Sequence, residues 1–137
     1  MDRPLVRKLL LGNQDQIALK VSLPLHLDLP RKDLKKCPKG YRRFHLNKNA
    51  ERNANGFVYN EAKQLFVEDF KKRTEHLNLT RITEPVCLCF TIYKKNKVKC
   101  DLGNYSVVEK FVSDALVKLD VLDDDNIDYI QGIFCFW

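Results

Sequence analysis

The feature that most constrains the fold of this chain is an apolar stripe over residues 105–119. Its members follow the pattern i, i+1, i+4, i+5, i+8, i+9, and they are Val107, Val108, Phe111, Val112, Ala115 and Leu116, with Leu119 closing the run. This spacing places them on one side of an α-helix. Because so wide an apolar face must be covered, the stripe predicts a helix packed on a second layer of structure.

The remaining segments predict what that layer contains. Residues 60–76 repeat the helical spacing, with Asn60 as a plausible N-cap. Three segments have the alternation or the β-forming residues typical of strands, and they are 16–23, 85–93 and 127–137. We therefore predict a single α+β domain over residues 1–137, in which two main helices cover a small mixed β-sheet. Residues 1–15 would form an arm, either ordered or disordered.

The N-terminus carries no targeting signal that we recognise. No stretch reaches the roughly 18 apolar residues of a membrane-spanning helix. The opening segment MDRPLVRKLLLGNQDQ has a short apolar run interrupted by charges, without the long apolar centre of a signal peptide. We expect a cytoplasmic protein with no membrane partner.

Basic residues are concentrated in two places. The net charge is +6, and residues 31–52 hold nine Lys or Arg against two acids. A second run, KKNKVK, covers 94–99. We take residues 30–56 as a basic DNA-binding loop, because cations in such a loop can hold phosphates. A generic solvated surface is the alternative interpretation of the same charge. The candidate contacts in the two runs are Arg42, Arg43, Lys48, Arg52, Lys94, Lys95, Lys97 and Lys99. Interleaved aromatic residues could stack on bases or anchor the loop to the core, and they are Tyr41, Phe44 and Phe57.

Five aspartates lie close together in the sequence, and they are Asp120, Asp123, Asp124, Asp125 and Asp128. Like charges at this spacing repel one another unless a cation offsets them. A solvated acidic loop is one interpretation and a metal site is the other. An EF-hand is excluded, because Asp128 stands where its glycine belongs and Phe134 where its glutamate belongs. Acids beside a basic surface are what a metal-dependent enzyme acting on a polyanion needs.

The cysteines do not predict a disulfide framework. There are five, an odd number, and none of them forms a CxxC motif. Cys87 and Cys89 lie two apart in a predicted strand, so they would share a face, and we expect buried free thiols. A zinc site formed by Cys37 with His26 or His45 is the alternative, although its spacing fits no common zinc module.

One stretch resembles a known family. The chain reads DLGN at 101–104, Lys110, DAL at 114–116, and then an aspartate run that ends at Asp125. This order resembles the C-terminal half of RusA-family Holliday junction resolvases, most strongly over 98–130. The resemblance implies a small, basic, dimeric phage or prophage enzyme that cuts four-way DNA junctions with Mg²⁺ held by aspartates, Mn²⁺ being a possible substitute.

Carried onto this chain, the resemblance implies a role for each matching residue. Asp101 and Asp125 would hold the metal, with Asp124 as the neighbour of Asp125. Lys110 would lie near the scissile phosphate, where a cation stabilises developing charge. Asp114 matches the aspartate of the DAL motif, or it is a structural acid facing Lys110 and Lys118 at helical spacing.

The chain departs from the family pattern at Gly103, which stands where the second acid of the family's Asp-x-Asp-Asn belongs. The interval from Asp101 to Lys110 is also about three residues longer. Glu109 is expected on the polar side of the helix with Ser113, where it could supply the missing carboxylate, or it is a surface acid favoured at the start of a helix. Two functions therefore stay open: a Mg²⁺-dependent junction endonuclease, or a catalytically impaired RusA-like module that binds DNA or a protein.

Overall fold

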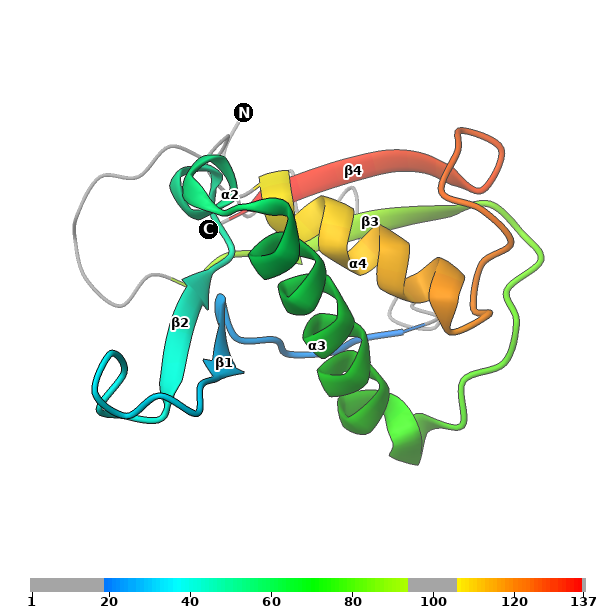
Figure 1. Cartoon of the computed structure of the whole chain (residues 1–137). Coiled ribbons are helices and arrows are strands. Elements are labelled where there is room, and N and C mark those ends of the chain that lie inside the picture. The colour runs from blue at the N-terminus through cyan, green and yellow to red at the C-terminus, as the bar shows by residue number, and fades with distance from the viewer. Residues whose placement is uncertain (1–18, 94–105, 137) are drawn as a thin grey trace.

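Two long helices cross between two separate pairs of strands (Figure 1). The structure is a computed structural model that describes residues 19–93 and 106–136, with side chains up to Phe134. Its elements are β1 (His26–Pro30), β2 (Tyr41–His45), α2 (Lys48–Asn53), α3 (Gly56–Thr74), the 3₁₀ turn η2 (Glu75–Leu77), β3 (Val86–Thr91), α4 (Ser106–Lys118) and β4 (Ile130–Phe136). The α+β class and the single domain are confirmed.

Helix α4 forms where the apolar stripe predicts it. All six stripe residues within the helix are buried, and the sheet residues Val86, Leu88 and Phe90 pack against the same core. The helix ends in a Schellman motif, in which Asp120 N–H donates to Val117 O and Val121 N–H to Leu116 O. Asp120 occupies the left-handed position of this motif, with φ 57°.

The strands form two two-stranded sheets in the described part of the chain, where we expected one mixed sheet. Strands β1 and β2 pair antiparallel, with Leu27 opposite Phe44. Strands β3 and β4 pair parallel, and α4 lies in the connection between them. A parallel pair needs such a crossover, because a tight hairpin reverses the chain direction. Helix α4 therefore has a strand on either side of it in the sequence.

The predicted first strand is wrong over its described part. Residues 19–23 are not in a strand, and residues 16–18 lie outside the described residues. The alternating side chains of this segment do pack on the core, and they are Leu19, Val21, Leu23 and Leu25. The ladder begins only at His26, two residues after Pro24, which has no N–H to donate.

The basic segment 30–56 is also more regular than predicted. It contains β2 and α2, and its longest loop is residues 31–40, the tip of the β1–β2 hairpin. Asn47 caps α2 by accepting from Ala50 N–H at 2.9 Å, and Asn55 caps α3 by accepting from Val58 N–H at 2.9 Å. Helix α3 therefore starts before Asn60, the predicted cap. Asparagine is a strong N-cap, and two of them at short spacing set two helix starts.

The aromatic residues of the basic segment differ in how deeply they are buried. Phe44 is buried and stacks on Phe111 of α4, with ring centroids 6.3 Å apart. Phe66 of α3 meets the same Phe111 ring edge-on at 5.5 Å. Phe44 is therefore a core anchor, whereas Phe57 is 90% exposed at the start of α3. Tyr41 is half-buried, with the Arg43 guanidinium 5.9 Å from its ring centroid.

The prediction of buried thiols is wrong for the two strand cysteines. Cys87 and Cys89 are free and exposed on β3, while Cys37 is free and half-buried. The two strand thiols occupy the alternate positions of β3 that point away from the core, whereas Leu88 and Phe90 point into it. Among the described residues, no three His, Cys, Asp or Glu side chains come together, so the zinc alternative has no support there.

None of the helices in the described ranges is both long enough and apolar enough to cross a membrane.

Candidate functional site

The five clustered aspartates have different roles in the structure. Asp120 belongs to the helix end described above. Asp123 forms an ion pair with Arg81. Asp124 builds the turn, because its Oδ1 accepts from Asp125 N–H at 2.7 Å and its Oδ2 accepts from Asn126 Nδ2 at 3.1 Å. Much of the cluster is therefore a structured loop, which leaves Asp125 for a separate contact.

Asp125 faces helix α4. Its Oδ2 accepts from Lys110 Nζ at 3.2 Å, although the two residues lie 15 positions apart. The loop after α4 runs back along the helix and brings the carboxylate to its first half. These are two of the residues that the family resemblance singled out, and the structure brings them together.

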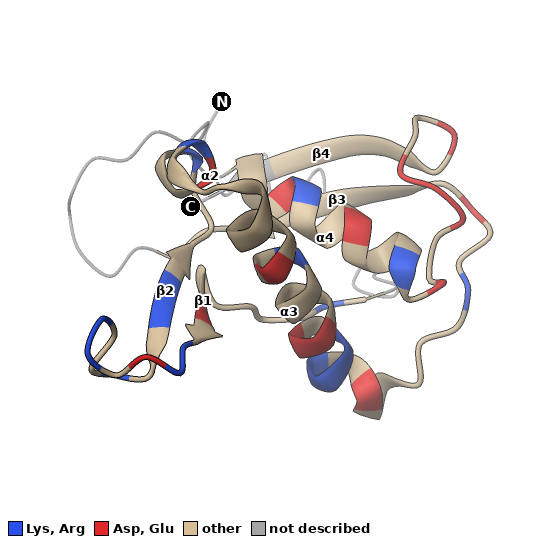
Figure 2. Ribbon diagram, viewed as in Figure 1, with Lys and Arg blue, Asp and Glu red and all other residues tan. Residues whose placement is uncertain are grey.

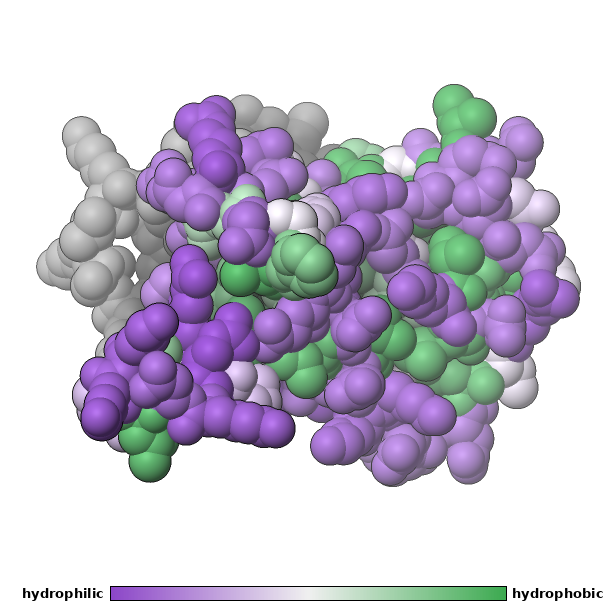
Figure 3. Space-filling view, in the orientation of Figure 1, coloured by the Kyte–Doolittle hydropathy of each residue, from purple (hydrophilic) through white to green (hydrophobic). Residues whose placement is uncertain are grey.

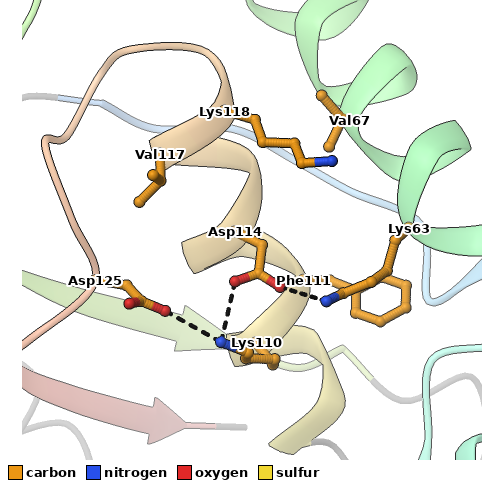
Figure 4. A pocket seen from close by; sticks show the side chains of 8 residues that line it. All are labelled: Lys63, Val67, Lys110, Phe111, Asp114, Val117, Lys118 and Asp125. Atoms are coloured by element: carbon orange, nitrogen blue, oxygen red, sulfur yellow. Dashed lines mark hydrogen bonds and ion pairs between the residues drawn. The ribbon is translucent and has the colours of Figure 1, made fainter. Parts of the chain in front are cut away.

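Lys110 also contacts a second acid, and the contact continues to another helix. Lys110 Nζ lies 3.0 Å from Asp114 Oδ1, and Asp114 Oδ2 lies 2.7 Å from Lys63 Nζ on α3 (Figure 4). We call Lys63, Asp114, Lys110 and Asp125 the lysine–aspartate network. Its charges alternate along the chain of contacts, and it ties α3, α4 and the acidic loop together.

The electrostatics of the network follow from these contacts. Hydrogen bonds to Asp114 and then to Asp125 raise the pKa of Lys110 above its ordinary value. Partial burial alone would raise the pKa of Asp114, but hydrogen bonds from Lys63 and Lys110 outweigh that effect and lower it. Both groups therefore stay charged over the whole physiological pH range.

The network borders a pocket of about 250 Å³ (Figure 4). Apolar side chains from both helices contribute to the lining, and they are Val67, Phe111 and Val117. Three lysines line it as well, Lys63, Lys110 and Lys118, together with Asp114 and Asp125. With three cations against two anions, the pocket suits a group that carries negative charge.

The remaining predicted site residues are placed as follows. Asp101, Gly103 and the basic run 94–99, with Lys94, Lys95, Lys97 and Lys99, lie outside the described residues. Glu109 lies on α4 beside Ser113, which is buried and whose Oγ donates to the Glu109 carbonyl at 2.8 Å. That side of α4 is therefore not the polar side that we expected. Asp114 faces Lys110, as the structural alternative predicted, but its second partner is Lys63 of α3 and not the predicted Lys118.

The predicted DNA contacts divide into two groups. Arg43 pairs with Asp28 at 3.1 Å, and Lys48 pairs with Glu51 at 3.6 Å. Arg42 and Arg52 are exposed and form no ion pair with another described residue. Within the described ranges, these two guanidinium groups therefore have no carboxylate partner to give up before they bind a phosphate.

The hairpin tip carries more cations than the predicted contacts include. Lys32, Lys35, Lys36 and Lys39 are exposed there, without an ion pair to any described residue. The one acid of the tip, Asp33, turns its Oδ1 toward the backbone N–H groups of Lys35 and Lys36. Figure 2 shows the basic residues along this hairpin, and Figure 3 shows strongly hydrophilic side chains gathered over it at lower left.

Sequence reasoning missed Lys63. Its signal was present, because Lys63 and Val67 lie four positions apart on the predicted helix, but nothing in the sequence says which side of that helix faces Asp114. The four hairpin lysines were counted as part of the charge and not named as contacts. Their exposure depends on the hairpin turn, which the sequence did not predict.

The described acidic residues differ in how well they suit Mg²⁺. Mg²⁺ needs one or two carboxylates, with waters and substrate phosphates as its other ligands. Asp125 fits this need, because its carboxylate is one-third exposed and already attracts a cationic group, the Lys110 ammonium. Asp124 fits less well, since both of its oxygens hold the turn. A second carboxylate would have to come from Asp101 or from Glu109.

Comparison of the chain with models of protein families, with curated proteins and with solved structures found no match.

Proposed function

We propose that the chain is a RusA-like, Mg²⁺-dependent endonuclease that resolves four-way DNA junctions in phage or prophage recombination and repair. One observation carries the proposal: Asp125 and Lys110, distant in sequence, meet at 3.2 Å beside a pocket with excess positive charge. A metal-ligating carboxylate and a lysine at the reacting phosphate are what the family resemblance implies for these two positions.

Different residues of the chain would bind the metal, stabilise charge on the phosphate and hold the DNA. Asp125, with Asp101, would hold Mg²⁺, which supplies an activated water and neutralises charge on the phosphodiester. Lys110 would stabilise the charge that develops on the phosphate oxygens as the bond breaks. The exposed cations of the hairpin tip, with Arg42 and Arg52, would hold the DNA backbone outside the site.

The assembly and the location follow from the substrate. Resolving a four-way junction needs two symmetric cuts, so the natural assembly is a homodimer with two-fold symmetry. The proposed place of action is the cytoplasm of a bacterium or of a phage-infected host.

A second candidate is a RusA-like module that binds DNA or a protein and cuts poorly. Gly103 favours it, because a glycine has no side chain to ligate a metal. The engaged state of Asp124 also favours it, since this aspartate does not readily replace the missing acid.

The test compares a labelled four-way junction with a linear duplex of the same arm sequence. Cleavage is recorded in Mg²⁺ and in Mn²⁺, and binding is recorded in EDTA on the same samples. Symmetric nicking of the junction alone is the result that the endonuclease proposal expects. Tight junction binding without nicking in either metal would favour the module instead. Absence of salt-dependent DNA binding would contradict both DNA-binding proposals, because phosphate contacts must weaken as salt rises.

A further inference from the structure

Lys63 is the member of the lysine–aspartate network that lies farthest from Asp125. It projects from α3, and its Nζ lies 2.7 Å from Asp114 Oδ2 on α4. The two side chains are 29% and 23% exposed, so solvent screens this pair less than a fully exposed one. Lys110 takes the other oxygen of the same carboxylate at 3.0 Å. Asp114 therefore bridges two lysines from two helices.

Lys63 is itself held in place by the core. Its Nζ lies 5.4 Å from the centroid of the Tyr59 ring, one helical turn earlier on α3. That ring meets Phe111 of α4 edge-on at 5.6 Å. Because Phe111 is fully buried, the contacts of Lys63 start from a fixed point of the core. Neither Lys71 nor Lys72, farther along the same helix, has an ion pair with any described residue.

The contact between Lys110 and Asp125 cannot persist unchanged while the site works as proposed. A divalent cation on the Asp125 carboxylate would repel the Lys110 ammonium, since like charges at this range oppose each other. Lys110 would then keep only Asp114 as its partner. The position of its ammonium during the reaction would depend on how firmly Asp114 is held.

We propose that Lys63 is a positioning residue for Lys110, acting through Asp114. It holds the Asp114 carboxylate from the side of α3, so that the free oxygen stays turned toward the Lys110 ammonium. Lys63 itself contacts neither the reacting phosphate nor the metal. This inference rests on the proposed function, because it assigns Lys63 a part in the same cleavage.

The test uses Lys63→Gln, Lys63→Arg and a matched control, Lys72→Gln, which removes the same charge from the same helix. Single-turnover cleavage of the junction should fall on the order of tenfold in Lys63→Gln, because a displaced catalytic group loses rate. Junction affinity in EDTA should fall by at most about threefold, because Lys63 is one of three lysines that line the pocket and is already paired with Asp114. Lys63→Arg should restore most of the rate, and Lys72→Gln should cut like wild type.

A second readout does not depend on cleavage. The side-chain NMR signal of Lys110 should move in Lys63→Gln and stay in place in Lys72→Gln, with both variants showing the dispersed spectrum of the folded chain. An unmoved Lys110 signal overturns the proposal, and so does wild-type cleavage by Lys63→Gln. If the wild-type protein does not cut at all, that result contradicts the proposed endonuclease function and, with it, the role of Lys63 in cleavage. Wild-type cutting with no effect of Lys63→Gln overturns the positioning role alone.

Discussion

Single aspartates of the acidic loop are best understood one at a time, by what each side chain contacts. Asp120 ends a helix, Asp124 builds a turn and Asp125 meets Lys110. Asp128 is exposed, and the structure gives its side chain no partner among the described residues. Substitutions of the same kind should therefore have different effects along this one segment.

At Asp120 the backbone conformation determines how a substitution changes the free energy of unfolding. With φ at 57°, the residue is in the left-handed region, where a β-branched side chain costs about 1–2 kcal/mol. Asp120→Val should lower the free energy of unfolding by about that amount, whereas Asp120→Gly should raise it by about 0.5 kcal/mol. Chemical denaturation measures both. Asp128→Val is the matched control and should change the free energy by less than about 0.5 kcal/mol. Equal losses at the two positions would contradict this account of the helix end.

The ion pairs of Asp114 should make the stability of the folded chain decrease in acid. Its pKa is lower in the folded chain than in the unfolded chain, so the ion pairs of Asp114 contribute stability that is fully present above the ordinary pKa of about 3.9. That contribution is lost as the pH falls through the lowered folded pKa. The advantage of wild type over Asp114→Asn in the free energy of unfolding should therefore be constant near neutral pH and shrink in acid. An advantage that grows in acid would show that Asp114 is not held by Lys63 and Lys110.

At the scale of the elements, the β1–β2 hairpin is a projecting strand pair with a strongly basic tip (Figure 2). The tip of the hairpin is joined to α3 by Arg31, whose Nη1 lies 2.8 Å from Glu61 Oε1. Gly40 takes the left-handed φ of 79° that the returning turn requires, and its carbonyl accepts from Arg31 N–H at 2.8 Å. The tip therefore presents its lysines from a fixed platform.

The salt dependence of DNA binding tests whether this tip contacts phosphates. Replacing the adjacent pair Lys35 and Lys36 by glutamine should reduce the slope of log K against log salt by about 1.8, or 0.9 for each lost contact. The matched control replaces another adjacent exposed pair, Lys71 and Lys72 on α3, and removes the same charge. We expect the control to keep the wild-type slope. Equal slopes for the two double variants would mean that the tip is only part of a general positive field.

At the scale of the whole molecule, local pattern predicted the elements whose signal is periodic. The stripe over residues 105–119 defined α4 almost to the residue, and the β-rich runs defined β3 and β4. Residues 30–56 were harder, because β2 and α2 are short and polar, and they depend on the cap at Asn47 and on the turn at Gly40. The division of the described strands into two sheets was not predictable either, since strand pairing is set by contacts between distant segments.

The sequence predicted some of the residues of the candidate site, but it did not predict how they contact one another. The resemblance singled out Lys110 and Asp125, but only the loop built by Asp124 and Asn126 brings the carboxylate back along α4. Lys63 could not be named, because its role depends on how α3 crosses α4. Residues that lie on one element follow from the sequence, whereas contacts between elements follow from the packing of the whole chain.

The most direct test of the central claim compares Asp125→Asn with Asp128→Asn on a four-way junction in Mg²⁺. Both variants remove one negative charge from the same loop, three positions apart. If Asp125 belongs to the metal site, its substitution should reduce cleavage at least about a hundredfold, the scale of losing one transition-state contact, with junction binding in EDTA retained. Asp128→Asn should cut like wild type. Full cleavage by Asp125→Asn would contradict the account and leave its contact with Lys110 as a structural ion pair.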